Sequence, residues 1–147
     1  MRLTRSVCYA VGILLQIQGC QKRGPMTAAR IARGCKFPPR FLYRVLRRLV
    51  DAGVLKGISG PGGGYALARP ATRISLYEIV MAVESAPEVP RLPAVCPRHR
   101  PAMNAINELS ERNVDRFLED LKRVKLAKLN RLIAKKPIRR AAGRRSR

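Results

Sequence analysis

The chain has no tryptophan, few aromatic and acidic residues, and a single histidine. Its 147 residues include four Tyr, three Phe and nine Asp or Glu. Proteins that bind single-stranded nucleic acid by base stacking need aromatic side chains among their positive charges, so the sequence disfavours that class. No motif pairs a nucleophile with a base, which leaves an enzyme as the weakest hypothesis.

Cysteine and long apolar runs are also scarce. The four cysteines, at positions 8, 20, 35 and 96, have neither the paired spacing of a zinc site nor the density of a disulfide framework. The apolar stretch 7–17 is short and lacks a small-residue cleavage site, so it predicts a buried helix rather than a signal peptide or a membrane span. We therefore expect a protein of the reducing cytoplasm with no membrane partner.

Positive charge, in contrast, is in large excess. Lys and Arg number 31, and the net charge is +22. A polyanionic partner is the simplest reason for such a surface, and nucleic acid is favoured over an anionic membrane because no apolar anchor accompanies the charge. No acidic residue follows Asp120. Residues 136–147 are predicted to form a disordered basic tail that neutralises phosphates, the alternative being a tail that only solubilises.

A basic amphipathic helix is predicted over residues 38–52. At 100° per residue, one face is apolar and consists of Phe41, Leu42, Val45, Leu46 and Leu49. The opposite face carries Arg40, Tyr43, Arg44 and Arg47. An α-helix fits the major groove, and Arg pairs with guanine or clamps phosphate, so the polar face indicates DNA contact. The alternative is a solvated cationic face.

Two further elements flank this helix. Thr27 is the expected N-cap of a short helix over residues 28–33, and Pro39 is tolerated in the first turn of the helix that follows. This order predicts a helix-turn-helix whose second helix is exposed at its N-terminal end. Strands are predicted at 54–59 and 65–68 around the turn 60–64, and a β-hairpin directly after a basic helix is typical of a wing. A phosphate-cradling loop is the competing interpretation of the glycines, but no Gly-Lys-Ser/Thr follows.

The order and the amino-acid sequences of these segments resemble the IscR/NsrR/CymR family of bacterial dimeric transcription regulators. The resemblance lies in RLT at the start, PPRFL with LRRLVDAGVL, GPGGGYALARP, and ISLYEIVMAVE. It covers residues 1–85 well and the remainder by architecture only. It implies a mostly α fold with a small β wing, in which a winged helix-turn-helix domain at 1–85 is joined to a long C-terminal dimerisation helix.

Candidate DNA-binding residues follow from the two predicted elements and the resemblance. Many members of the family carry an arginine where this chain has Ser59, so contact by the wing at 54–68 is expected to be weaker, or to come from Lys56 and the turn backbone. The full candidate set is Thr27, Pro39, Arg40, Tyr43, Arg44, Arg47, Lys56, Ser59, Gly60, Gly62, Gly63 and Tyr65.

Residues 101–135 contain no glycine and only Pro101 at their start, and they favour a single long helix. Its apolar residues fall within a stripe about 140° wide. Such a helix would be about 52 Å long, too long for a domain of about 85 residues to cover. We therefore expect a two-fold homodimer, as the resemblance implies, with Phe117, Leu121 and Val124 in the interface. The alternative is a stripe that packs only on its own domain.

The proline-rich segment 86–100 is predicted to be a surface loop and a candidate sensor loop. Iron–sulfur members of the resembled family carry three cysteines there, whereas this loop holds only Cys96. Cys96 and His99 of one chain, with Cys8 of the other, would give a sulfur and nitrogen ligand set for an altered iron–sulfur cluster or zinc. Cys96 alone is a candidate thiol switch. The simplest expectation is no cofactor, with Cys8 packed as a small hydrophobe and His99 solvated.

Taken together, these features predict a cytoplasmic, homodimeric, sequence-specific DNA-binding transcription regulator, acting as a repressor by steric exclusion. The alternative is a non-specific nucleic-acid coating or packaging protein on the same fold. The regulator should keep a discrete footprint in excess random DNA, and the coating protein should not.

Overall fold

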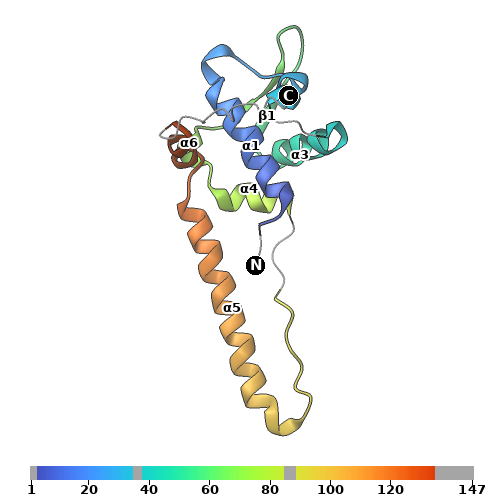
Figure 1. Ribbon diagram of the computed structural model, residues 1–147, viewed down its shortest axis with the longest axis vertical. Coiled ribbons are helices and arrows are strands. Elements are labelled where there is room, and N and C mark those ends of the chain that lie inside the picture. The colour runs from blue at the N-terminus through green and yellow to red at the C-terminus, as the bar shows by residue number, and fades with distance from the viewer. Residues whose placement is uncertain (1–2, 35–37, 85–88, 135–147) are drawn as a thin grey trace, which may run out of the picture.

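The chain folds into a helical head with a small β-hairpin, from which one long helix extends as a stem (Figure 1). The structure is a computed structural model and describes residues 3–34, 38–84 and 89–134. Its α-helices are α1 Arg5–Gly19, α2 Ala28–Gly34, α3 Pro39–Asp51, α4 Leu76–Val83, α5 Arg100–Arg123 and α6 Leu126–Ala134. The strands are β1 Leu55–Ile58 and β2 Gly64–Leu67, and the short 3-10 turns are η1 Gln21–Arg23, η2 Ala71–Arg73 and η3 Pro97–His99. The mostly α fold with a small β wing is confirmed.

Helix ends lie where the capping residues predict them. Thr4 accepts a hydrogen bond from the backbone N–H of Ser6 at the start of α1. Gly53, with a φ of 66°, ends α3 in the left-handed conformation that glycine favours. Ser75 and Glu78 form a reciprocal capping box at the start of α4. Burial raises the pKa of Glu78, but hydrogen bonds from Ser75 and the Arg69 guanidinium outweigh it, so that this pKa lies below its ordinary value.

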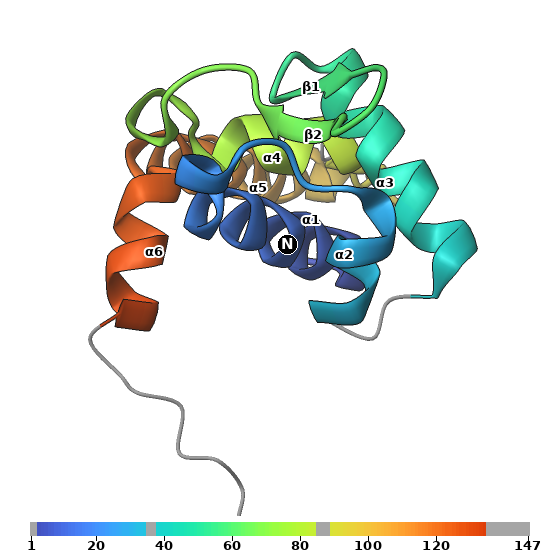
Figure 2. The same cartoon turned by 90° about the horizontal axis from the view of Figure 1, so that it is seen from above.

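The core of the head forms around α1. Figure 2 shows α1 passing between α3 on one side and α6 on the other, with α4 and the hairpin above it. The largest side chains that are fully buried in this core include Ile13, Leu14, Ile31, Leu42, Leu46, Leu49, Ile74, Ile79 and Leu126. Because α3 contributes its whole apolar face to this core, its orientation is fixed by packing.

The hairpin is attached to the segment that precedes α2. β1 and β2 pair antiparallel, with Lys56 opposite Ala66 and Ile58 opposite Gly64. The N–H of Met26 donates to the carbonyl of Tyr65 at 2.9 Å, and the N–H of Tyr65 donates to the carbonyl of Met26 at 2.8 Å. The wing therefore has a backbone connection to the start of α2.

The prediction of one continuous helix over 101–135 is wrong. α5 ends at Arg123, and Val124 has an extended backbone with φ −82° and ψ 115°. The carbonyl of Val124 accepts from the N–H of Leu76 at 2.8 Å, and the N–H of Leu126 donates to the carbonyl of Ile74 at 2.9 Å. This backbone pairing with the segment before α4 interrupts the helix at residues 124 and 125. It returns the chain to the head, where α6 packs on α1 and η2.

The break also changes the environment of the residues that were expected at a dimer interface. Leu121 is only 5% exposed and belongs to the hydrophobic core of its own chain. Phe117 is half-buried and packs against the same core, and Val124 is half-buried at the break. The head of its own chain thus already covers Leu121 and leaves little of it for a second copy to contact, and the assignment of Phe117, Leu121 and Val124 to a dimer interface stays a prediction.

Candidate nucleic-acid interface

The polar face of α3 is exposed as the sequence predicted. Tyr43 is 59% exposed, and Arg40, Arg44 and Arg47 are also exposed. The Arg44 guanidinium lies 4.7 Å from the centre of the Phe41 ring, and stacking of this kind limits the conformations of the arginine.

Two of the other polar groups on α3 differ in their local partners. The Nε atom of Arg47 lies 3.8 Å from a carboxylate oxygen of Asp51, and both side chains are more than half exposed, so this pair contributes about 0 to 1 kcal/mol. Arg40 has no acidic side chain within ion-pair distance among the described residues. Arg40 is therefore available to an external anion.

The start of the helix-turn-helix also matches the prediction. The Thr27 hydroxyl accepts from the N–H of Arg30 at 3.3 Å, so Thr27 caps α2 while remaining exposed. Pro39 is the first residue of α3, and the preceding Pro38 makes no side-chain cap. The N–H groups of Phe41 and Leu42 donate to the carbonyl of Pro38 at 3.0 Å each.

The wing turn depends on its glycines for two different reasons. Gly60 and Gly62 have φ values of 93° and 75°, which side chains rarely adopt. A Cβ atom at Gly63 would lie 2.2 Å from the carbonyl oxygen of Ile58, so this position has no space for a side chain. Lys56 and Ser59 are exposed beside the turn. Tyr65, in contrast, is half-buried and packs against the core, which gives it a structural role.

Replacing Gly64 with alanine is expected to detach the wing from the segment before α2. A Cβ atom there would lie 2.5 Å from the carbonyl oxygen of Met26, and the φ of 148° is itself unfavourable for alanine. We expect a loss of about 2 to 3 kcal/mol in the free energy of unfolding, measured by urea denaturation. The control is Gly57→Ala in β1, where nothing lies within 4 Å of the added methyl group. Equal stability of the two variants would contradict this account of the wing.

Acidic residues are distributed unevenly between the head and the stem. The helix α5 carries Glu108, Glu111, Asp115, Glu119 and Asp120. The described part of the head holds only Asp51, Glu78 and Glu84. The positive charge is therefore least neutralised on the head, which carries α3 and the wing, and a polyanion is attracted there rather than to the stem.

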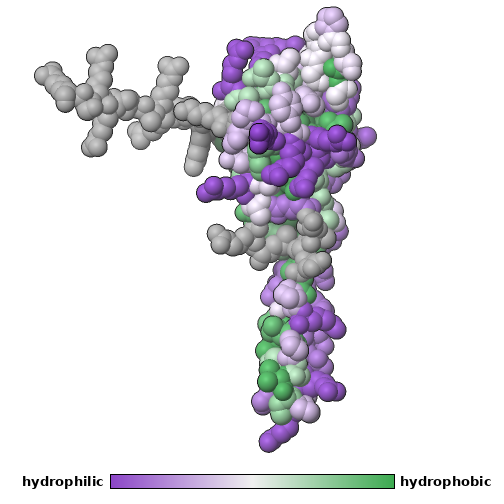
Figure 3. All heavy atoms as spheres, turned by 90° about the vertical axis from the view of Figure 1, so that its right-hand side faces the viewer, coloured by the Kyte–Doolittle hydropathy of each residue, from purple (hydrophilic) through white to green (hydrophobic). Residues whose placement is uncertain are grey.

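The distal half of the stem has an exposed apolar surface, which we call the stem patch: Leu92, Val95, Ile106 and Leu109. Their exposed fractions are 49%, 95%, 41% and 55%. Figure 3 shows apolar side chains gathered on one side of the lower stem and polar side chains along the other. Apolar side chains that are exposed together on a stem that leaves its own domain are typical of an interaction surface.

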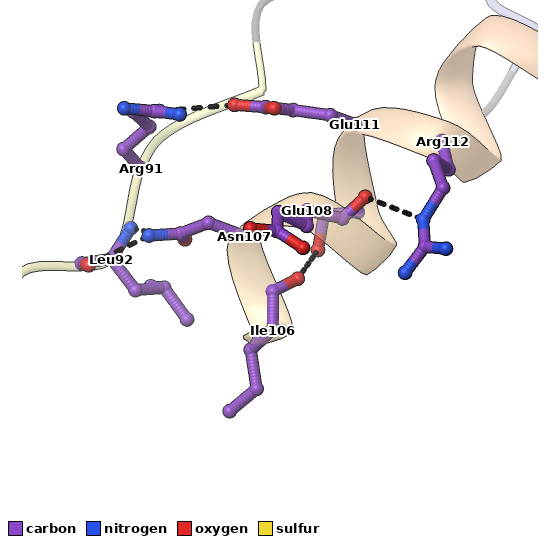
Figure 4. A network of polar contacts seen from close by, with 8 residues as sticks. Arg91, Leu92, Ile106, Asn107, Glu108, Glu111 and Arg112 are labelled. Atoms are coloured by element: carbon purple, nitrogen blue, oxygen red, sulfur yellow. Dashed lines mark hydrogen bonds and ion pairs between the residues drawn. The ribbon is translucent and has the colours of Figure 1, made fainter. Parts of the chain in front are cut away.

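A polar clamp holds the extended segment 89–96 against the stem (Figure 4). The Asn107 amide is buried; its oxygen accepts from the N–H of Leu92 at 2.8 Å, and its nitrogen donates to the carbonyl of Leu92 at 3.1 Å. Arg91 and Glu111 add an ion pair at 3.0 Å. Sequence reasoning missed this clamp, although Asn107 is a polar residue within the apolar stripe of α5 and so gave a usable signal.

A second missed contact connects α3 to the end of α4. The Arg48 guanidinium donates to the carbonyl of Val83, and the Thr4 hydroxyl donates to the carboxylate of Glu84 next to it. Arg48 was part of the predicted helix, but it faces the head and not the outer polar face. These contacts join the start of α1, α3 and α4 at one point.

The three candidate metal ligands are not brought together within one chain. Cys8 is exposed on α1 in the head, whereas Cys96 and His99 lie at the far end of the stem (Figure 1). Among residues 3–34, 38–84 and 89–134, no three His, Cys, Asp or Glu side chains form a group that could hold a metal ion. The predicted set of Cys8 from one chain with Cys96 and His99 from another stays a prediction.

The basic tail and the membrane were also subjects of the sequence-based predictions. The predicted tail at 136–147 lies outside the described residues. Within the described ranges, no helix has both the length and the apolar character needed to cross a bilayer.

Comparison with known proteins finds HTH-type transcriptional regulators as relatives. The chain is 34% identical over 91 residues to the HTH-type transcriptional regulator IscR of Xenorhabdus nematophila, covering 62% of this chain and 56% of the relative. It is 32% identical over 91 residues to IscR of Photorhabdus laumondii, with the same coverage. The matches thus span little more than half of these two relatives.

Solved structures with the same fold are also regulators. CymR (YrzC), the global cysteine regulator of Bacillus subtilis, superposes with a TM-score of 0.70 at 25% identity, covering 90% of this chain and 98% of CymR. The IscR of T. potens superposes with a TM-score of 0.64 at 20% identity, covering 97% of this chain and 94% of that protein. The second likeness shows the fold alone.

The family model that matches is Rrf2, described as iron-dependent transcriptional regulators, and it covers residues 3–131. That range includes the head, the wing and the stem. The chain therefore belongs to the Rrf2 family of transcriptional regulators.

Proposed function

We propose that the chain binds double-stranded DNA as a homodimer and represses transcription by occupying its site. The observation that carries this proposal is the exposed polar face of α3, with Arg40, Tyr43 and Arg44 on a helix whose apolar face is fixed in the core. Such a helix enters the major groove, while Lys56, Ser59 and the turn at 60–64 contact the backbone or the minor groove. Family membership favours this function over the coating protein considered as the alternative.

Dimerisation is proposed through the stem patch. It lies away from the head, so a second copy can cover it without blocking α3. Two α3 helices related by a two-fold axis read half-sites about 10 base pairs apart, so the operator is a pseudo-palindrome. The proposed site of action is the cytoplasm, where bacterial DNA is located.

The family description names iron, but the described residues of one chain do not fit an iron centre. The segment 89–99 contributes one cysteine, and no group of three ligands forms. No step of the proposed function passes through a metal.

Replacing Arg40 or Arg44 with alanine is expected to weaken binding to the specific site by about 1 to 3 kcal/mol and to relax the preference at one base position in each half-site. The reason is the loss of a guanidinium that contacts a base edge. Fluorescence anisotropy on duplexes that vary one position at a time measures both effects. The control, Arg116→Ala, removes an exposed charge of the same sign from the stem and should change neither.

The basic tail is expected to act differently from these arginines. Deletion of residues 138–147 should weaken binding to all sequences by a similar factor and reduce the slope of affinity against salt concentration, because the tail contacts phosphates only. If the deletion removed the sequence preference while both arginine variants kept it, the proposed roles of helix and tail would be wrong.

A further inference from the structure

A pocket of about 220 Å³ lies at the base of the wing, between the hairpin, the end of α1 and the segment that leads to α2. Ile17 and Leu67, which are 3% and 5% exposed, belong to both its lining and the core. Pro25 contributes from the connecting segment, and Lys56, Ile58 and Ala66 contribute from the wing. Figure 2 shows this connecting segment running alongside the wing.

The strand register places three of the wing residues that line this pocket on one face of the hairpin. Lys56 pairs with Ala66 across the hairpin, and directly paired residues project to the same face of a sheet. Ile58 lies two residues after Lys56 and therefore projects to that face as well. Ile58 remains 40% exposed. The hairpin thus contributes a lysine, an aliphatic side chain and a small residue to the lining of the pocket.

The chemistry of the lining selects a class of ligand. Most of the lining side chains are apolar, Gln21 is uncharged, and Lys56 is the only charged residue among them. Lys56 has no acidic side chain within ion-pair distance in the described parts of the chain. A dry cavity of about 150 Å³ accepts benzene, so the pocket at the wing can hold a ligand of about the size of benzene that carries one additional polar group. An amphipathic monocarboxylate has this shape and the charge that complements Lys56.

We propose that this pocket binds a small amphipathic carboxylate, and that the bound ligand weakens DNA binding. The regulatory part rests on the proposed function, because it requires Lys56 to contact DNA. The ligand carboxylate neutralises the ammonium group that the wing would offer to phosphate. The pocket also borders Pro25, next to Met26, which is hydrogen-bonded to Tyr65 and directly precedes the α2 cap at Thr27. The wing and the start of α2, which are both parts of the proposed DNA-binding surface, therefore border the ligand.

The first experiment measures binding to the full chain without DNA. Benzoate and hexanoate are titrated into ¹⁵N-labelled protein, with benzamide as a neutral analogue and acetate as a control for ionic strength. We expect saturable shifts of the amide signals of Lys56, Ile58 and Ala66 with either of the two larger carboxylates. Benzamide should bind at least about tenfold more weakly, and acetate should not saturate.

Two variants separate the cavity from the charge. Ala66→Leu fills the pocket while Lys56 remains, so it should abolish carboxylate binding and leave DNA affinity within about twofold of the wild type. Lys56→Gln keeps the cavity but removes the ammonium group, so it should weaken carboxylate binding about tenfold or more. Circular dichroism and thermal unfolding confirm that both variants fold.

The second experiment adds DNA. Saturating benzoate should reduce the DNA affinity of the wild type about fivefold or more, and neither variant should respond. Unsaturable shifts, or equal binding of benzamide and benzoate, would overturn the proposed pocket. Saturable binding with unchanged DNA affinity would overturn the regulatory step. Absence of DNA binding in every sample would overturn the proposed function, while the carboxylate titration would still decide the pocket.

Discussion

Replacing both Ile106 and Leu109 with aspartate is expected to give a folded monomer that has lost operator affinity. These side chains are 41% and 55% exposed on the distal stem and belong to neither the core nor the half-buried residues packed on it. In a two-fold dimer, the two substitutions place four carboxylates in a desolvated interface. These charges would have no opposite charge to pair with. Because a monomer carries one α3, affinity for the full site should fall about 100-fold or more.

Sedimentation velocity measures the change in assembly, and circular dichroism checks the fold. The matched control is the double variant Asn104→Asp and Asn113→Asp, which adds the same charge at exposed polar positions of α5. The control should remain a dimer. An unchanged sedimentation coefficient in the Ile106 and Leu109 variant would show that the stem patch is not the interface.

Replacing Leu121 with aspartate is expected to unfold the head rather than to separate subunits. Leu121 is 5% exposed in the core of its own chain, and the adjacent break at Val124 returns α6 to that core. A buried carboxylate without a partner, together with lost apolar contacts, should reduce the free energy of unfolding by about 3 to 5 kcal/mol. This cost is a large part of the stability of a typical domain.

Urea denaturation followed by circular dichroism measures this loss. Asn113→Asp, on the same helix but exposed and outside the stem patch, is the control and should change the unfolding free energy by less than about 1 kcal/mol. A stable, folded Leu121→Asp monomer would contradict the packing described above and would return Leu121 to the interface.

The helix α3 and the wing turn were predictable because the sequence patterns that specify them are local. On α3 the apolar and basic residues separate cleanly at the helical period, and Leu42, Leu46 and Leu49 are all buried while Arg40 is exposed. The turn at 60–64 contains glycines that its backbone angles and crowding require. Such features need no knowledge of distant contacts.

The break between α5 and α6 was not predictable in this way. No glycine or proline marks residues 123–126, and local propensity there favours helix. The helix ends because the backbone around Val124 hydrogen-bonds to Ile74 and Leu76, some 50 residues earlier in the chain. The apolar stripe was therefore assigned to one surface, although its Leu121 end belongs to the core and its Ile106 end is exposed.

Selection of bound duplexes from a random-sequence library tests most directly the claim that α3 reads DNA sequence. With the wild type, we expect enrichment of one pseudo-palindrome with half-sites about 10 base pairs apart. With Arg40→Ala, the same selection should return that pattern with one position in each half-site relaxed. Enrichment of no pattern by the wild type, or an identical pattern from both proteins, would contradict the account.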